Sequence, residues 1–202
     1  MTWSEPTPSL AHALSVMGWT SLVNRKCLRS VHWQVVAAEP SFSGLVHFEP
    51  QDSPVPWGAA WTDGSIRSQG GAARVQPASG LRLGCRVEDP RSSTHCELVA
   101  LHLSRQLRPA PVILSESLVS LRLIAGWHRR SVRDVLECPD RLEVRAFLHQ
   151  WQDRGPPPIL EKVKAHDAQG AAAGKPKAVG NDLADAHAKA TAGAVAPSTF
   201  RT

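Results

Sequence analysis

The stretch that decides the fold is WTDGSIRSQGGAA, residues 61–73, in which Asp63 stands between a Trp-Thr pair and a Gly-Ser pair. Small and aromatic apolar residues precede this acid, as expected of a buried strand that ends at a turn. Asp-Gly is a strong turn signal, and the Gly70-Gly71 pair permits backbone angles that other residues avoid. We therefore expect a strand that ends at Asp63. Two interpretations of the acid stay open: a turn residue, or one member of a group of carboxylates.

Composition and charge indicate a globular protein with an excess of basic residues. The 202 residues are 42% hydrophobic and 20% charged, which is ordinary for a soluble globular protein. Lys and Arg (23) outnumber Asp and Glu (18), and the sequence pI of about 9.4 fits an anionic partner such as nucleic acid. The four cysteines form no C-x-x-C pair, which favours a reduced, intracellular location, with nucleus, cytoplasm and organelle left open. Neither a secretory signal nor a long apolar run is present, so we expect no membrane partner.

Beyond residue 70 the apolar pattern changes from strands to helices. The runs at 71–76 and 81–89 alternate apolar and polar residues, which with the first strand predicts a three-stranded antiparallel meander. The later expected elements are a helix at 95–107 capped by Thr94, a strand at 111–117, a helix that starts at 117 and stops near Gly126, and a helix at 139–153. They are followed by a strand at 159–166, a small-residue loop at 167–180, and a helix at 182–192 capped by Asn181.

This order of elements predicts an α/β fold: a mixed five-stranded sheet, made of the antiparallel meander plus parallel strands, flanked by helices. Residues 56–193 would form the folded domain, after an extension of unknown role at 1–55 and before a flexible tail at 194–202. Phe147 and Trp151 are expected in the core.

Four carboxylates stand at the ends of the predicted elements: Asp63, Glu97, Glu116 and Asp185. In open α/β sheets, ligands gather at the carboxyl ends of strands. Each acid also has a simpler interpretation. Glu97 suits the first turn of its predicted helix as a favourable charge, Glu116 suits a solvated loop, and Asp185 suits an ordinary face of an Ala-rich helix.

Five motifs in order resemble those of the ribonuclease H family: TDGS at 62–65, ELVA at 97–100, ILSES at 113–117, VKAH at 163–166 and GNDLADAHAKA at 180–190. The resemblance covers about residues 57–192 and implies a ribonuclease H-like fold. It also implies that the four carboxylates are ligands of two Mg²⁺ ions, with Mn²⁺ as a substitute. Such ions activate a water molecule and stabilise the leaving oxygen in phosphodiester hydrolysis. His166 would help proton transfer or product release; the alternative is a surface histidine without a role.

The sequence departs from the family pattern at two places. The family usually has Asp where this chain has Glu116, whose extra methylene moves the carboxylate. The loop between His166 and Asn181 is also longer than usual and rich in Gly, Ala and Lys.

The resemblance also implies nucleic-acid contacts. A basic protrusion would present Trp127, Arg129, Arg130 and Arg133, for which a solvated basic face is the alternative. Gly64 and Ser65, beside Asp63, would recognise the 2′-hydroxyl of RNA. Additional phosphate contacts are expected from Lys162, Lys164, Lys175 and Lys177.

These expectations lead to two functional hypotheses. The first is a hydrolase: a metal-dependent endonuclease that cuts the RNA strand of RNA/DNA hybrids, either freestanding or within a retroelement reverse transcriptase or a ribonucleoprotein. The second is a ribonuclease H-like fold that has lost its chemistry and serves as a nucleic-acid-binding or assembly module.

Overall fold

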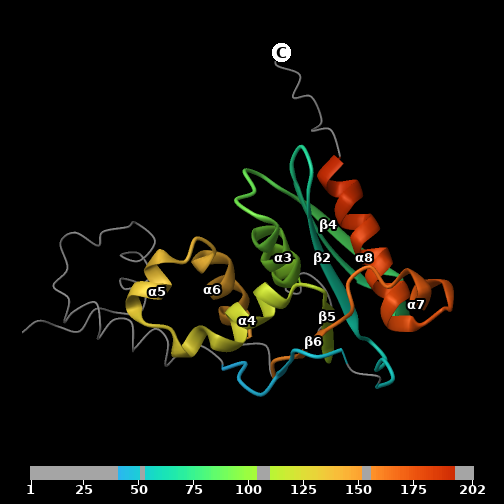
Figure 1. The fold of residues 1–202 in the computed structure, drawn as a ribbon, viewed down its shortest axis with the longest axis horizontal. Helices are drawn as coiled ribbons and strands as arrows, with labels where there is room; N and C mark the ends of the chain where they lie inside the picture. Colours follow the sequence, from blue (N-terminus) through green and yellow to red (C-terminus); the bar gives the residue numbers. More distant parts are fainter. Residues whose placement is uncertain (1–40, 51–52, 104–109, 152–155, 194–202) are drawn as a thin grey trace, which may run out of the picture.

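The computed structural model describes residues 41–50, 53–103, 110–151 and 156–193. These residues form an α/β fold in which helices cover both faces of a mixed sheet (Figure 1). The strand order is β1-β6-β5-β2-β3-β4. The strands are β1 (Val46–His47), β2 (Ala60–Ile66), β3 (Gly70–Gln76), β4 (Leu81–Val87), β5 (Val112–Ser115) and β6 (Ile159–Lys162).

The sheet confirms the predicted meander and adds one strand to the predicted five. β2, β3 and β4 are antiparallel, whereas β2 with β5, β5 with β6, and β6 with β1 pair in parallel. The added strand, β1, lies in the segment predicted to be an extension, and its Val46 is paired with Leu160 of β6. It is two residues long, too short to produce an alternating pattern in the sequence.

The first turn lies later than predicted. β2 does not end at Asp63 but continues through Ile66, so that Asp63 pairs with Ala73 in the middle of the ladder. The chain reverses at 67–69, where the Arg67 backbone N–H donates to the carbonyl of Gln69. The turn interpretation of Asp63 was therefore wrong.

Glycine is needed in the Gly70-Gly71 pair for a different reason from the predicted turn geometry. Neither glycine of the 70–71 pair adopts a left-handed backbone. A Cβ on Gly71 would lie 2.2 Å from the carbonyl oxygen of Ala188, so this position is restricted by close helix packing and not by turn geometry.

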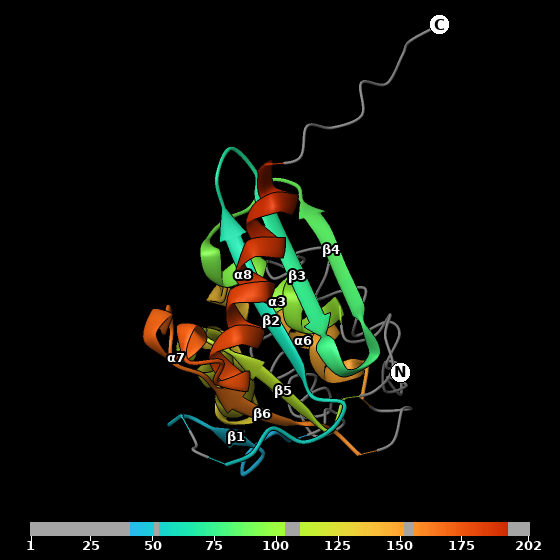
Figure 2. The same ribbon diagram turned by 90° about the vertical axis from the view of Figure 1, so that its right-hand side faces the viewer.

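The helices divide between the two faces of the sheet (Figure 2). α8 crosses β2, β3 and β4 on one face, while α3 and α6 lie behind the sheet in the same view. The helical elements are η1 (Pro77–Ser79), α3 (Ser93–His102), α4 (Leu118–Gly126), η3 (Trp127–Arg129), α5 (Val132–Glu137), α6 (Arg141–His149), α7 (Ala168–Ala172) and α8 (Pro176–Gly193).

α3 begins earlier than predicted. Its cap is Ser92 and not Thr94: the Ser92 hydroxyl accepts a hydrogen bond from the backbone N–H of His95 at 3.0 Å. Glu97 consequently lies in the second turn of the helix, where it cannot serve as a first-turn charge. The C-terminal part of the predicted helix, 104–107, lies outside the described residues.

α8 also begins earlier than predicted, and the loop predicted at 167–180 is largely helical. α7 occupies part of that segment, and α8 starts at Pro176, so Asn181 lies inside the helix and is not its cap. A proline at the first helical position has the backbone angle that a helix requires. Gly174, just before it, has a φ of +70°, a left-handed conformation that glycine adopts without strain.

The largest core cluster lies between the sheet and the helices α3, α4 and α6. Phe147 and Trp151 belong to it, which confirms their predicted place, and the Phe147 ring packs on Phe42 with ring centroids 5.2 Å apart. On the opposite face, Trp61 packs beneath α8, and its indole N–H donates to the carbonyl of Lys177. None of the helices in the described residues has the length and apolar character needed to cross a membrane.

Candidate metal centre

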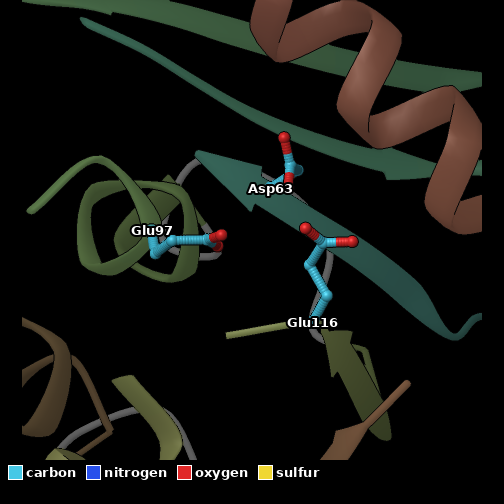
Figure 3. Close-up of side chains that lie close together, drawn as sticks. All are labelled: Asp63, Glu97 and Glu116. Atoms are coloured by element: carbon cyan, nitrogen blue, oxygen red, sulfur yellow. The ribbon is translucent and has the colours of Figure 1, made fainter. Parts of the chain in front are cut away.

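Three carboxylates from three different elements converge on one point of the sheet (Figure 3). Asp63 comes from the middle of β2, Glu97 from α3, and Glu116 from the residue that follows β5. Each offers one oxygen such that these oxygens all lie within 4.8 Å of one another. Asp63 and Glu116, which are more than fifty positions apart in the sequence, thus share one acidic group with Glu97.

Close backbone packing brings Glu97 to the strand. A Cβ on Gly64 would lie 2.2 Å from the backbone nitrogen of Glu97 and 2.4 Å from the carbonyl carbon of Cys96. Glycine is the residue that permits this approach. The backbone amide of Gly64 also favours the charged forms of Asp63 and Glu97, and so lowers the pKa of both carboxylates against the effect of burial.

The Glu97 carboxylate is buried without a full set of partners. The residue is 6% exposed, and its Oε2 atom has no hydrogen-bond partner in the structure. An unsatisfied buried carboxylate oxygen is costly, and it normally binds a cation or an ordered water molecule. Glu97 extends from α3 toward Asp63 and Glu116 in Figure 3, so its carboxylate belongs to the shared acidic group.

The pKa values of the group show that its negative charges are only partly compensated by the lysines near it. Burial, together with the charges of Glu116 and Asp185, raises the pKa of Asp63 from 3.8 to about 7, while the charge of Lys189 opposes the rise. Burial also raises the pKa of Glu97, with Asp63 and Glu116 acting in the same direction. Like charges held this close destabilise one another unless a cation neutralises them.

Glu116 is oriented by α8. The side-chain amide of Asn181 donates a hydrogen bond to its Oε2 at 2.9 Å. Asn181 is 2% exposed, so the contact is shielded from solvent, and its own Oδ1 has no hydrogen-bond partner. Because a second hydrogen bond fixes a ligand's rotamer, Asn181 compensates for the extra flexibility of a glutamate at this position.

Asp185, the fourth predicted ligand, lies near the group but outside the set of three. Its Oδ2 accepts a hydrogen bond from the Lys189 ammonium, one turn later on α8, at 2.6 Å. Its charge nevertheless reaches Asp63. A second lysine, Lys162 at the end of β6, is half-buried and interacts electrostatically with Glu116 and Glu97.

His166 lies between β6 and α7 and is exposed. Its backbone has a φ of +48°, a left-handed conformation uncommon outside glycine, and its carbonyl accepts a hydrogen bond from the Ala168 N–H. Among the predicted RNA-contacting residues, Gly64 and Ser65 are half-buried beside Asp63.

The prediction of a surface Trp127 was wrong. The residue is 1% exposed and belongs to the main core cluster, so its ring is unavailable for stacking on a base. The Arg130 guanidinium lies 5.9 Å from the ring centroid, while Arg129 is exposed. Arg133 is paired with Glu137 at 2.7 Å.

Two of the four lysines predicted to contact phosphates form ion pairs with carboxylates. Lys177 binds Glu161 at 2.5 Å and Lys164 binds Asp167 at 3.3 Å. With Lys175, these two lysines line a cavity of about 510 Å³ at the start of α8. None of the three converging carboxylates lines that cavity, so it is distinct from the acidic group.

Three residues of the site were not recognised in the sequence as parts of it: Lys162, Lys189 and the amide of Asn181. Lys189 had a usable signal, because a lysine four residues after an aspartate on a helix pairs with it. The contact between Asn181 and Glu116 had no signal in the sequence, since it depends on how α8 crosses the end of β5.

Carboxylate oxygens in this arrangement suit a hard divalent cation such as Mg²⁺, Mn²⁺ or Ca²⁺. The unsatisfied oxygen of Glu97 and the raised pKa of Asp63 both fit such an ion. No protein-family model and no curated protein sequence matches this chain. The described residues therefore support a candidate metal centre on an α/β sheet, and its chemistry has to be inferred from the site.

Proposed function

We propose that this protein is a metal-dependent endonuclease that hydrolyses the RNA strand of RNA/DNA hybrids with two divalent cations, Mg²⁺ or Mn²⁺. One observation carries the proposal: one carboxylate oxygen from each of Asp63, Glu97 and Glu116 lies within 4.8 Å of the other two. These are three of the four acids that the sequence motifs single out as ligands. The basic net charge of +5 fits a nucleic-acid substrate.

The residues of the site have separable tasks under this proposal. Asp63, Glu97 and Glu116 hold the cation, and Asn181 keeps the Glu116 carboxylate directed at the group. Bound divalent cations would activate the attacking water and stabilise the leaving oxygen. His166 is exposed and would exchange protons with solvent. Gly64 and Ser65, next to Asp63, would face the 2′-hydroxyl of the RNA strand.

A second hypothesis differs from the first in that the chain binds nucleic acid without cutting it. The observation that favours it is the pairing of Asp185 with Lys189, which keeps one expected ligand outside the acidic group. In that case, exposed basic residues such as Arg129 would carry the function.

A cleavage assay separates the two hypotheses. The protein is incubated with a labelled RNA/DNA hybrid, single-stranded RNA or duplex DNA, each with Mg²⁺, Mn²⁺ or a chelator. We expect metal-dependent cleavage of the hybrid that is lost in Asp63→Asn. The matched control is Asp182→Asn, an exposed acid on α8, which should cleave like the wild type. Hybrid binding without cleavage, by a folded protein with either metal, would favour the second hypothesis.

A further inference from the structure

A lysine ammonium near the acidic group occupies a carboxylate that a metal cation could bind. The Lys189 ammonium binds Asp185 Oδ2 at 2.6 Å, and the two residues are one helical turn apart on α8. The lysine side chain is 39% exposed and that of the aspartate 20%, so the pair is partly open to solvent and can separate without unfolding the helix.

Lys189 acts on the acidic group as well as on its helical partner. Its charge opposes the rise in the pKa of Asp63, so the ammonium lies within electrostatic reach of that carboxylate. In the described part of the chain, the oxygens that can share one ion come from Asp63, Glu97 and Glu116, without Asp185. A cation shared by Asp63 and Asp185 would therefore meet a positive charge that already acts on both carboxylates.

We propose that this protein binds its divalent cations in order: the first on Asp63, Glu97 and Glu116, and a second, shared by Asp63 and Asp185, only after the Lys189 ammonium has left Asp185. The inference rests on the metal centre of the proposed function. It makes Lys189 a positioning residue that controls access to the second position.

The position formed by the three carboxylates can accept an ion, because the Glu97 side chain extends toward Asp63 and Glu116 and its Oε2 is buried without a hydrogen-bond partner. The second position differs in that a cation must displace an ammonium from Asp185 and bind close to it. An anionic phosphate of a substrate would attract the same ammonium, which links entry of the second ion to the arrival of nucleic acid.

The test is a calorimetric titration of the metal-free protein with Mn²⁺ alone. The wild type is compared with Lys189→Met, which keeps the length of the side chain without its charge, and with Asp185→Asn. Lys164→Met is the matched control, because it removes an equal charge from another local pair, Lys164–Asp167, outside the acidic group. Circular dichroism verifies that each variant is folded, and Lys189→Arg restores the charge.

We expect the wild type to bind one equivalent tightly and a second at least tenfold more weakly. Lys189→Met should tighten the second step by about tenfold, as expected when one unit charge a few ångströms from a divalent ion is removed from a partly solvated site. Asp185→Asn should keep the first step and lose the second. Lys164→Met and Lys189→Arg should behave like the wild type.

Two equivalents of equal affinity in the wild type, no binding at all, or a Lys189→Met titration identical to that of Lys164→Met would overturn the inference. A Lys189→Arg titration like that of Lys189→Met would overturn it too. The readout needs neither substrate nor turnover, so the two proposals fail separately. Ordered binding without hybrid cleavage would refute the nuclease alone, and cleavage with two equal sites would refute only the order.

Discussion

Gly64 and Glu97 are in backbone contact: a Cβ on Gly64 would lie 2.2 Å from the Glu97 nitrogen. This contact fixes the distance between β2 and α3, and therefore the distance between the carboxylates that the two elements carry. The glycine is as much a part of the metal centre as the acids.

Gly64→Ala is expected to lower the free energy of unfolding by about 2 kcal/mol or more, because the added methyl group pushes α3 away from the strand. Urea unfolding measures the loss. Gly126→Ala is the control, since a Cβ there meets nothing within 4 Å, and it should be nearly neutral. Equal stabilities of the two variants would contradict the packing argument.

Asn181→Ala is expected to weaken Mg²⁺ binding by about 10- to 100-fold, because Glu116 loses the hydrogen bond that orients it. Titration of the metal-free protein with Mg²⁺ measures the affinity. Asp182→Ala, an exposed neighbour on α8, should bind Mg²⁺ like the wild type. An unchanged affinity in Asn181→Ala would show that Glu116 does not need this contact.

Without metal, the protein should lose stability as the pH rises from 3.8 to about 7. The folded state raises the pKa of Asp63 through that range, so the folded protein holds the proton more tightly than the unfolded chain. The stabilising effect of that proton is complete below the ordinary pKa and disappears above the raised one. Thermal unfolding of the wild type and of Asp63→Asn in a chelating buffer measures this pH-dependent loss of stability.

The melting temperature of the wild type should fall relative to that of Asp63→Asn as the pH rises through this window. Mg²⁺ added at the upper end should raise the wild-type value and leave the variant nearly unchanged. A difference between the two proteins that stays constant with pH would rule out Asp63 as the titrating group.

The ion pair between Lys177 and Glu161 should contribute to stability in proportion to its burial. The glutamate side chain is 7% exposed and the lysine 20%. Lys177→Met is therefore expected to cost about 3 kcal/mol, since it leaves a buried carboxylate without this partner. Arg133→Met breaks the exposed pair with Glu137 and should change the unfolding free energy little. Chemical denaturation of both variants compares them directly.

The elements that sequence patterns predicted well are those whose signals are local. The alternation in β3 and β4 and the apolar runs of β5 and α4 are present in each segment by itself, and the structure confirms these elements. The convergence of Asp63, Glu97 and Glu116 followed from the position of the acids on predicted elements combined with the family resemblance.

The misplaced boundaries of β2 and α8 have different causes. Asp63-Gly64 has the local preference of a turn, but strand pairing with β3 and packing against α3 override it. The early start of α8 was different, because Gly174 and Pro176 are recognisable signals of a helix start that the loop-like composition of the segment obscured. The Asn181 contact and strand β1 depend on partners far away in the sequence, which no local pattern reveals.

β1 has a consequence for the behaviour of the molecule in solution. By pairing with β6, it covers main-chain groups that would otherwise form an open sheet edge, and Phe42 just before it fills part of the core. A shortened chain that begins at residue 56 would expose that edge and leave a cavity beside Phe147. Such a chain should self-associate and precipitate at concentrations where the longer protein stays monodisperse.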